Sequence, residues 1–131
     1  MRLEASNEVV LLVKLEINDG QRMQFADAVD RMTSVVERRE PGLLRYQFHI
    51  LDDGRSARAI HVYRDAAALD MHVQVAKAEI ADVMQFASVV ELEIVGNVPH
   101  EIEQSRRRLV VTTSRARSGA HSSDAAYGFV R

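Results

Sequence analysis

The residues from Glu40 to Tyr63 read EPGLLRYQFHILDDGRSARAIHVY. The Pro and Gly at the start of this stretch end a preceding helix, because Pro disfavours the helical conformation of the residue before it and Gly permits the chain to reverse. Leu43–Leu51 and Ala57–Tyr63 are predicted as strands, and the Asp-Asp-Gly-Arg segment between them as a hairpin loop. We therefore expect these two strands to pair antiparallel.

Before this hairpin, Glu8–Ile17 alternates in the manner of a strand that uses both of its faces. One face is formed by Val9, Leu11, Val13, Leu15 and Ile17. Val10 and Leu12 on the other face are also apolar, which predicts that this face of the sheet packs on something else. Between this strand and the hairpin, apolar residues recur at helical spacing from Phe25 onward and predict an amphipathic helix that ends at Arg39.

After the hairpin, Asp65 is predicted to be the N-cap of a helical segment that runs through Ala87. The pattern allows a first short piece, Ala66–Met71, before a longer one, Val73–Phe86. A last strand follows at Val89–Val95. The order is therefore β-α-β-β-α-β, an α+β, ferredoxin-like split βαβ arrangement in which both helices cover one face of an antiparallel sheet.

This arrangement leaves the other face of the sheet bare. A single chain of 131 residues has only its C-terminal part left to cover that face, so a second copy is the simplest cover and a homodimer is predicted. In the C-terminal part, residues 100–108 are predicted as a short helix, 109–113 as a short strand and 114–131 as a flexible tail. The chain thus divides into a ferredoxin-fold domain, residues 1–108, and a C-terminal extension, residues 109–131.

Composition limits the classes of function. Seventeen Lys and Arg against nineteen Asp and Glu give a net charge of -2, which argues against a nucleic-acid partner. Cysteine is absent and the histidines form no zinc pattern, so no metal ligand set is expected. The longest apolar run, Val9–Val13, is too short to span a membrane, and no export signal is visible, so a cytoplasmic protein is expected.

Three segments together carry a resemblance to a known family. Residues 40–46 fit the pattern E-P-G-x-x-x-Y, and Tyr63 ends a strand before Asp65 to His72, which fit D-x-x-A-x-x-x-H. Residues 95–99 fit a strand-Gly-x-x-Pro ending. In this order and spacing, the motifs resemble the antibiotic biosynthesis monooxygenase (ABM) domain over about residues 8–108.

The resemblance implies a dimeric α+β barrel, in which two sheets pack face to face and each subunit has a ligand pocket between its sheet and its helices. The activities it implies are diverse: cofactor-free oxidation of quinols or polyketide anthrones, haem degradation, isomerisation of a small signalling molecule, or no assigned reaction. Haem degradation is disfavoured, because the Asn and Trp on which such members depend correspond here to Val13 and Tyr63.

A candidate pocket follows from alternation along the third strand. The residues that share one face of this strand are Ala57, Ala59, His61 and Tyr63. If this face lies beneath the helices, the two alanines form the floor of a cavity, and the histidine and tyrosine line it together with His72 from the following helix. Tyr46 and Phe25 complete the predicted substrate-binding residues.

Oxidation without a cofactor requires a substrate that gives an electron to dioxygen once it is deprotonated, so the protein must supply a base and a dry pocket. A neutral imidazole, with a pKa near ~6.5, suits this proton transfer. We predict His72 as the base, His61 or Tyr63 as its orienting partner, and Tyr63 or Tyr46 as a donor to the oxyanion. The family commonly has Glu in place of His61, so a carboxylate-dependent mechanism does not transfer directly. His49 is placed on the dimer face.

With the resemblance, these residues predict a cofactor-independent monooxygenase that oxidises a small aromatic quinol or polyketide-type substrate with dioxygen. One alternative is a non-catalytic, dimeric ligand-binding or stress-related protein whose pocket holds an apolar, quinone-like molecule. Another is an isomerase or lyase that uses the same histidine base on a small carbonyl compound. Dependence on oxygen separates the first prediction from both alternatives.

Overall fold

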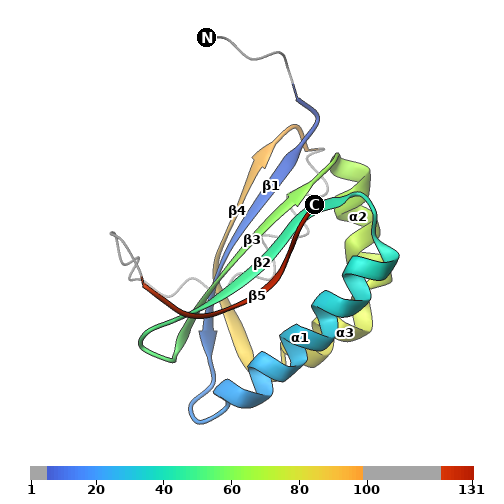
Figure 1. Cartoon of the computed structure of the whole chain (residues 1–131). Helices are drawn as coiled ribbons and strands as arrows, with labels where there is room; N and C mark the ends of the chain where they lie inside the picture. The colour runs from blue at the N-terminus through green and yellow to red at the C-terminus, as the bar shows by residue number, and fades with distance from the viewer. Residues whose placement is uncertain (1–5, 99–121) are drawn as a thin grey trace.

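The computed structural model describes residues 6–98 and 122–131 (Figure 1). In chain order, the elements are β1 (Val9–Ile17), α1 (Arg22–Arg39), β2 (Leu43–Leu51), β3 (Ser56–Tyr63), α2 (Ala66–Val75), α3 (Lys77–Val83), β4 (Ala87–Gly96) and β5 (Ser123–Val130). The predicted α+β, ferredoxin-like order is confirmed, with one strand added at the end.

The strands form one antiparallel sheet in the order β4-β1-β3-β2-β5. Leu11 in β1 pairs with His61 in the central strand β3, and His61 pairs in turn with Tyr46 in β2. Tyr46 pairs with Phe129 in β5. One row across the sheet therefore brings together an aliphatic side chain, a histidine, a tyrosine and a phenylalanine from four strands.

The helices lie on one face of this sheet, and the core lies between the two layers (Figure 1). α1 contributes Phe25, Val29, Met32 and Val36, all buried at the predicted spacing. The side chain of Asp65 accepts a hydrogen bond from the backbone N–H of Ala68, which confirms it as the N-cap of α2. The second helical segment does not divide at His72 as predicted. It divides at Ala76, between α2 and α3.

The prediction of a flexible tail over residues 114–131 is wrong for its last part. Ser123–Val130 forms β5, which pairs with β2 along its length and packs beside α1. The inward side chains of β5, Ala125, Tyr127 and Phe129, pack against the core. The predicted helix at 100–108, the predicted strand at 109–113 and the domain boundary after residue 108 lie outside the described residues.

The opposite face of the sheet carries a continuous group of apolar side chains. The register places Val10 of β1 beside Val62 of β3 and Val95 of β4, and Leu12 beside Ile60. These side chains are half-buried or exposed, and Leu12 is 38% exposed. In the described part of the chain, no helix is long and apolar enough to cross a membrane.

Candidate functional site

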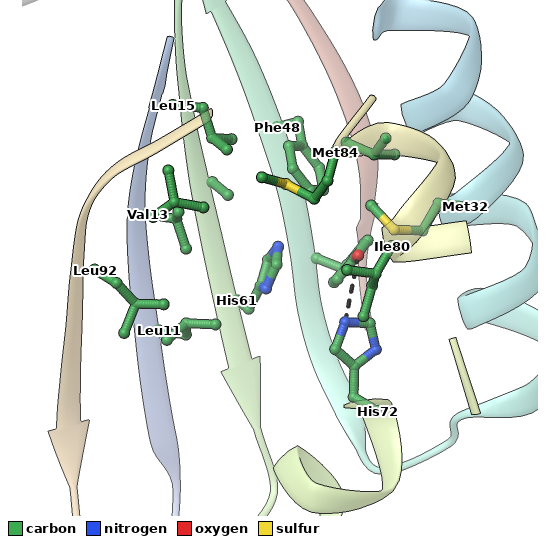
Figure 2. Close-up of a pocket in the computed structure, with 14 residues that line it drawn as sticks. Leu11, Val13, Leu15, Met32, Phe48, His61, His72, Ile80, Met84 and Leu92 are labelled. Carbon is green, nitrogen blue, oxygen red and sulfur yellow. Dashed lines mark hydrogen bonds between the residues drawn. The ribbon is translucent and has the colours of Figure 1, made fainter. Parts of the chain in front are cut away.

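A cavity of ≈170 Å³ lies between the sheet and the helices. The sheet contributes Leu11, Val13, Leu15, Phe48, Ala59, Val89 and Leu92 to its wall. The helices contribute Met32 of α1 together with Ile80, Val83 and Met84 of α3 and its C-cap. The three remaining lining residues, Tyr46, His61 and His72, carry polar groups. Figure 2 shows His61 near the middle of the lining side chains and His72 at lower right, with the aliphatic side chains and methionines around them.

The cavity combines a mostly apolar wall with a few convergent polar groups, which is the usual composition of a small-molecule site. Among its lining residues, Met84 is 38% exposed, and Ile80 and Leu92 are half-buried. These three side chains therefore mark the side on which the cavity reaches solvent, between α3 and the edge strand β4.

His72 is held from behind by a carboxylate. It lies in the last turn of α2, where only 3% of the residue is exposed, and its Nδ1 lies 2.9 and 3.1 Å from the two carboxylate oxygens of Glu40. Glu40, only 2% exposed, follows the end of α1. Because an ionised carboxylate only accepts hydrogen bonds, Nδ1 carries the hydrogen, and in the neutral ring Nε2 keeps its lone pair.

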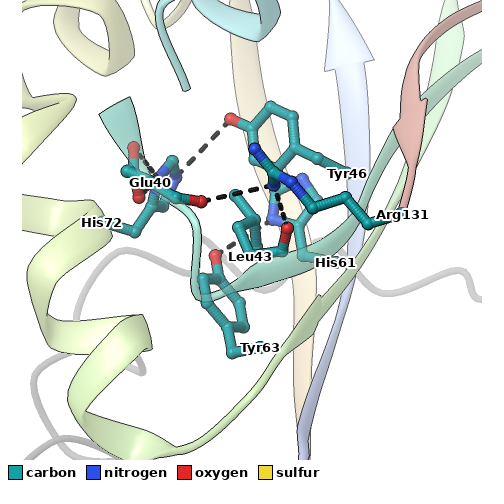
Figure 3. Close-up of polar contacts among 7 residues, drawn as sticks. All are labelled: Glu40, Leu43, Tyr46, His61, Tyr63, His72 and Arg131. Carbon is teal, nitrogen blue, oxygen red and sulfur yellow. Dashed lines mark hydrogen bonds and ion pairs between the residues drawn. The ribbon is translucent and has the colours of Figure 1, made fainter. Parts of the chain in front are cut away.

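Nε2 of His72, the ring nitrogen that does not contact Glu40, faces the hydroxyl of Tyr46. The Tyr46 Oη lies 3.5 Å from this nitrogen, at the limit of a hydrogen bond. The order Glu40, His72, Tyr46 thus forms a chain of polar groups that ends in the cavity (Figure 3). A base oriented by a third group is the arrangement that general-base catalysis requires.

The ring of Tyr46 is fixed by its neighbours. It stacks on His61 with ring centroids 4.0 Å apart, and Nδ1 of His61 lies 3.3 Å from the hydroxyl of Tyr63. Burial raises the pKa of Tyr46 well above its usual 10.0, and the nearby Tyr63 and Glu40 raise it further. Tyr46 therefore keeps its proton and can donate a hydrogen bond throughout the neutral range.

The structure brings together most, but not all, of the predicted site residues. Tyr46, Ala59, His61 and His72 line the cavity. Tyr63 is fully buried and reaches the site through its contact with His61. Ala57 and Phe25, also predicted as substrate-binding residues, are buried in the core and are not among the residues that line this cavity.

Glu40 is the residue that the sequence analysis missed. The sequence pattern places it at the end of a helix and in the E-P-G motif, whereas the structure places its carboxylate against His72. The motif itself was the available signal, because an acidic residue before Pro-Gly is not needed to end a helix. His49, predicted to lie on the dimer face, contacts Ser123 at the start of β5: its Nδ1 lies 3.1 Å from the Ser123 hydroxyl.

Nothing in this arrangement forms a recognisable metal site. Among the described residues, no group of three or more His, Cys, Asp or Glu side chains lies close enough together to hold a metal ion. The polar end of the cavity consists of two imidazoles and a phenol, with one carboxylate behind them. These groups are suited to proton transfer and to hydrogen bonding of an oxyanion.

The family model of antibiotic biosynthesis monooxygenase matches this sequence over residues 8–79. This range contains Glu40, Tyr46, His61 and His72. No curated protein sequence gives a match.

Solved structures of similar fold agree with this match. MupZ from Pseudomonas fluorescens is 21% identical with a TM-score of 0.67, over 91% of this chain and 94% of that one. SnoaB, a cofactor-independent oxygenase from Streptomyces nogalater, is 17% identical with a TM-score of 0.62, over 70% and 94%. A putative antibiotic biosynthesis monooxygenase from Caulobacter crescentus is 18% identical with a TM-score of 0.63, over 72% and 92%. At these identities the likeness shows the fold.

Proposed function

The chain belongs to the antibiotic biosynthesis monooxygenase family, and on this premise we propose that it is a cofactor-independent monooxygenase acting on a small aromatic quinol. The observation that carries the proposal is the buried Glu40–His72 pair, whose second imidazole nitrogen, Nε2, faces the Tyr46 hydroxyl in an otherwise apolar cavity. The description of SnoaB as a cofactor-independent oxygenase adds support from a protein of similar fold.

In the proposed reaction, Nε2 of His72 removes a proton from a hydroxyl of the bound substrate. Glu40 fixes the tautomer that leaves this nitrogen unprotonated, and its negative charge stabilises the imidazolium that forms. Because the pair is buried, the carboxylate acts on the imidazolium with little screening by water.

Tyr46 is proposed to donate a hydrogen bond to the resulting oxyanion. Its raised pKa keeps the hydroxyl protonated, so it remains a donor at the pH where His72 acts as a base. A hydrogen bond to a charged group contributes about 1.5–3 kcal/mol. The stacked His61 and the contact between His61 and Tyr63 hold the Tyr46 ring in place.

The deprotonated substrate then supplies the electrons for oxygen chemistry. It transfers one electron to dioxygen, and the two radicals join in a carbon–oxygen bond to give a peroxide. Loss of water from this peroxide turns the ring C–H carbon that bound oxygen into C=O. One oxygen atom enters the product and the other leaves as water, so the substrate supplies all four electrons and no separate reductant takes part.

The cavity limits the size and charge of the substrate. An apolar cavity of about 150 Å³ holds a benzene molecule, so ≈170 Å³ accommodates one aromatic ring with its substituents. A second ring would extend toward Met84, where the wall reaches solvent. Among the described residues, the lining contains no Lys, Arg, Asp or Glu, which favours a neutral substrate that loses its proton only after binding.

We also propose that the protein is a homodimer assembled through the apolar face of the sheet. Val10, Leu12, Ile60, Val62 and Val95 lie together there, on three adjacent strands. A second copy would remove this group from water and leave each cavity on the helical side of its own sheet.

Oxygen uptake tests the proposed reaction. The purified protein, treated with a chelator and freed of flavin, is mixed with reduced one-ring and two-ring quinols and with anthrone, and oxygen consumption is followed against the uncatalysed rate. We expect catalysed uptake that falls about 10²-fold or more in His72→Ala, since general-base catalysis contributes about 10²–10⁴-fold. His49→Ala is the matched control, because this histidine lies on the other face of the sheet and should leave the rate unchanged.

The same assay separates the alternatives. Binding of a quinone without any catalysed uptake would favour a ligand-binding protein and contradict the proposal. Turnover of a carbonyl compound that continues in the absence of oxygen would favour an isomerase or lyase. Uptake that survives in His72→Ala with the fold intact would remove this histidine from the mechanism.

A further inference from the structure

The arginine that directly follows the last strand reaches across to the turn that carries Glu40. The guanidinium of Arg131 donates hydrogen bonds to the backbone carbonyls of Glu37, Glu40 and Leu43, and the contact to Glu40 measures 3.3 Å. Figure 3 shows the contacts to Glu40 and Leu43. These three carbonyls lie at the end of α1, in the following turn and at the start of β2. A single side chain thus binds the backbone at Glu40 and on both sides of it.

Of these carbonyls, that of Glu37 belongs to the last turn of α1. The last carbonyls of a helix have no intrahelical donor, and an arginine can satisfy them while its charge complements the helix dipole. The turn also has a hydrogen bond of its own, from the N–H of Leu43 to the carbonyl of Glu40 at 3.1 Å. Arg131 adds to this bond a link between the turn and β5.

Two further contacts, one to β2 and one to Phe129 of β5, fix Arg131 relative to the site. Its backbone N–H donates to the carbonyl of Leu44 at 2.8 Å, and its guanidinium lies 4.5 Å from the ring centroid of Phe129. Phe129 in turn stacks against Tyr46, with ring centroids 6.0 Å apart. The same end of β5 therefore touches both the aromatic donor of the site and the backbone that carries its carboxylate.

We infer that Arg131 is a positioning residue, which holds the Glu40 turn so that the carboxylate meets Nδ1 of His72. Arg131 contacts neither the cavity nor the imidazole, so it acts through Glu40. The carboxylate must be placed to a few tenths of an ångström to bring both oxygens within 3.1 Å of one nitrogen. The kinetic consequence rests on the proposed function, whereas the effect on the tautomer of His72 does not.

The tautomer is therefore the first measurement. In protein labelled with ¹⁵N-histidine, and at a pH where the ring is neutral, we expect two well-separated nitrogen signals for His72, one protonated at Nδ1 and one bare at Nε2. In Arg131→Ala, both signals should move toward their average, as in the reference variant Glu40→Ala. Arg131→Lys keeps the positive charge but cannot bind three carbonyls at once, and should also lose the separation.

Two variants serve as matched controls. Arg38→Ala removes an arginine that binds a carbonyl of α1, that of Ser34, without touching the Glu40 turn. Val130→Ala changes the neighbouring residue of β5, whose side chain is exposed. Both should keep the tautomer of the unmodified protein. The amide spectra of β1 and β3 report whether each variant retains its fold.

Kinetics provide the second measurement if oxygen uptake is found. We expect Arg131→Ala to lower kcat about tenfold with KM nearly unchanged, because a misplacement of about 1 Å can cost about 10²-fold. An unchanged His72 tautomer in both Arg131 variants would overturn the inference, whatever happens to the rate. A shifted tautomer without any oxygen uptake would support the inference and count against the proposed function instead.

Discussion

Tyr46 is the residue whose pKa shows how strongly the site disfavours a further negative charge. It is fully buried, it stacks on His61, and its hydroxyl faces Nε2 of His72. Because both the surroundings and the neighbouring Tyr63 and Glu40 disfavour a phenolate, the folded protein binds the Tyr46 proton more tightly than the unfolded chain does. This gives the residue a signature in the stability of the protein as well as in its activity.

We predict that the free energy of unfolding falls with rising pH above about 10, where an unfolded tyrosine loses its proton. In that window the folded state retains the Tyr46 proton and the unfolded state does not, so one group contributes a slope of about 1.4 kcal/mol per pH unit. Urea unfolding between pH 8 and 11 measures this slope. In Tyr46→Phe the slope should be smaller by this amount.

Tyr127→Phe is the control, because this tyrosine is only half-buried in β5. It should leave the slope of the unmodified protein in place. Equal slopes in the unmodified protein and in Tyr46→Phe would contradict the raised pKa of Tyr46.

Met84 is predicted to control the size of the substrate. It lines the cavity but is 38% exposed, so a larger side chain there narrows the access of a second ring without touching the polar end. Met84→Trp should raise KM for a two-ring quinol about tenfold or more, with little change for a one-ring quinol, since even a methylene-sized change in an apolar pocket costs about 1–3 kcal/mol. Met71→Trp, exposed and outside the lining, is the matched control. Equal effects on both quinols would contradict this role.

At the scale of elements, β5 depends on a glycine that passes close to β2. Gly128 has a φ of 127°, and a Cβ built on it would lie 1.8 Å from the carbonyl oxygen of Tyr46. Gly128→Ala should therefore lower the free energy of unfolding by about 2–3 kcal/mol or detach β5, through backbone strain and this contact. Chemical denaturation and hydrogen exchange of the β5 amides measure the two outcomes.

Gly20→Ala separates strain from contact. Gly20 also has a positive φ, of 74°, but a Cβ there would meet no atom within 4 Å. It should cost about 1 kcal/mol from conformation alone. A loss in Gly128→Ala no larger than in Gly20→Ala would show that β5 does not approach Tyr46 as closely as the structure has it.

The elements found by periodicity are those whose side chains alternate sharply between core and solvent. In β1 and β3 every second residue is buried, and this pattern is already visible in the sequence. The sequence pattern does not reveal β5, because its inward residues, beginning with Ala125, are only half-buried and its Ser, Ala and Gly content is typical of a loop. The position of the helix break at Ala76 is not predictable from the sequence, because alanine is a strong helix former and gives no local signal for a break.

The candidate site was predictable to the extent that it follows from faces of single elements. Alternation in β3 placed His61 and Ala59, and the helix after Asp65 placed His72. The partner of His72 depends on how α1 ends relative to α2, and no spacing within one element reveals that the carboxylate of Glu40 arrives there. Long-range pairs of this kind are set by tertiary packing.

At the scale of the whole molecule, the two faces of the sheet differ in what covers them. The helices cover one face, whereas Val10, Leu12, Ile60, Val62 and Val95 remain half-buried or exposed on the other. A continuous apolar group on a sheet face is typical of an interface between proteins. In a twofold dimer each of these residues is present in the interface once from each subunit, so one substitution changes the interface at two places.

We predict that the protein in solution has twice the 14.7 kDa mass of one chain, and that Leu12→Glu converts it to a monomer. Leu12 lies near the middle of the apolar group, and a buried, unpaired carboxylate there costs about 3–5 kcal/mol, or a dissociation constant raised about 10²-fold or more. Light scattering coupled to size exclusion measures the mass. Met23→Glu is the control, because Met23 is 77% exposed on α1 and its substitution should leave the dimer intact.

A dimer that survives Leu12→Glu would place the interface elsewhere. An unmodified protein that is monomeric at micromolar concentration would mean that the apolar face of the sheet is covered by something other than a second copy.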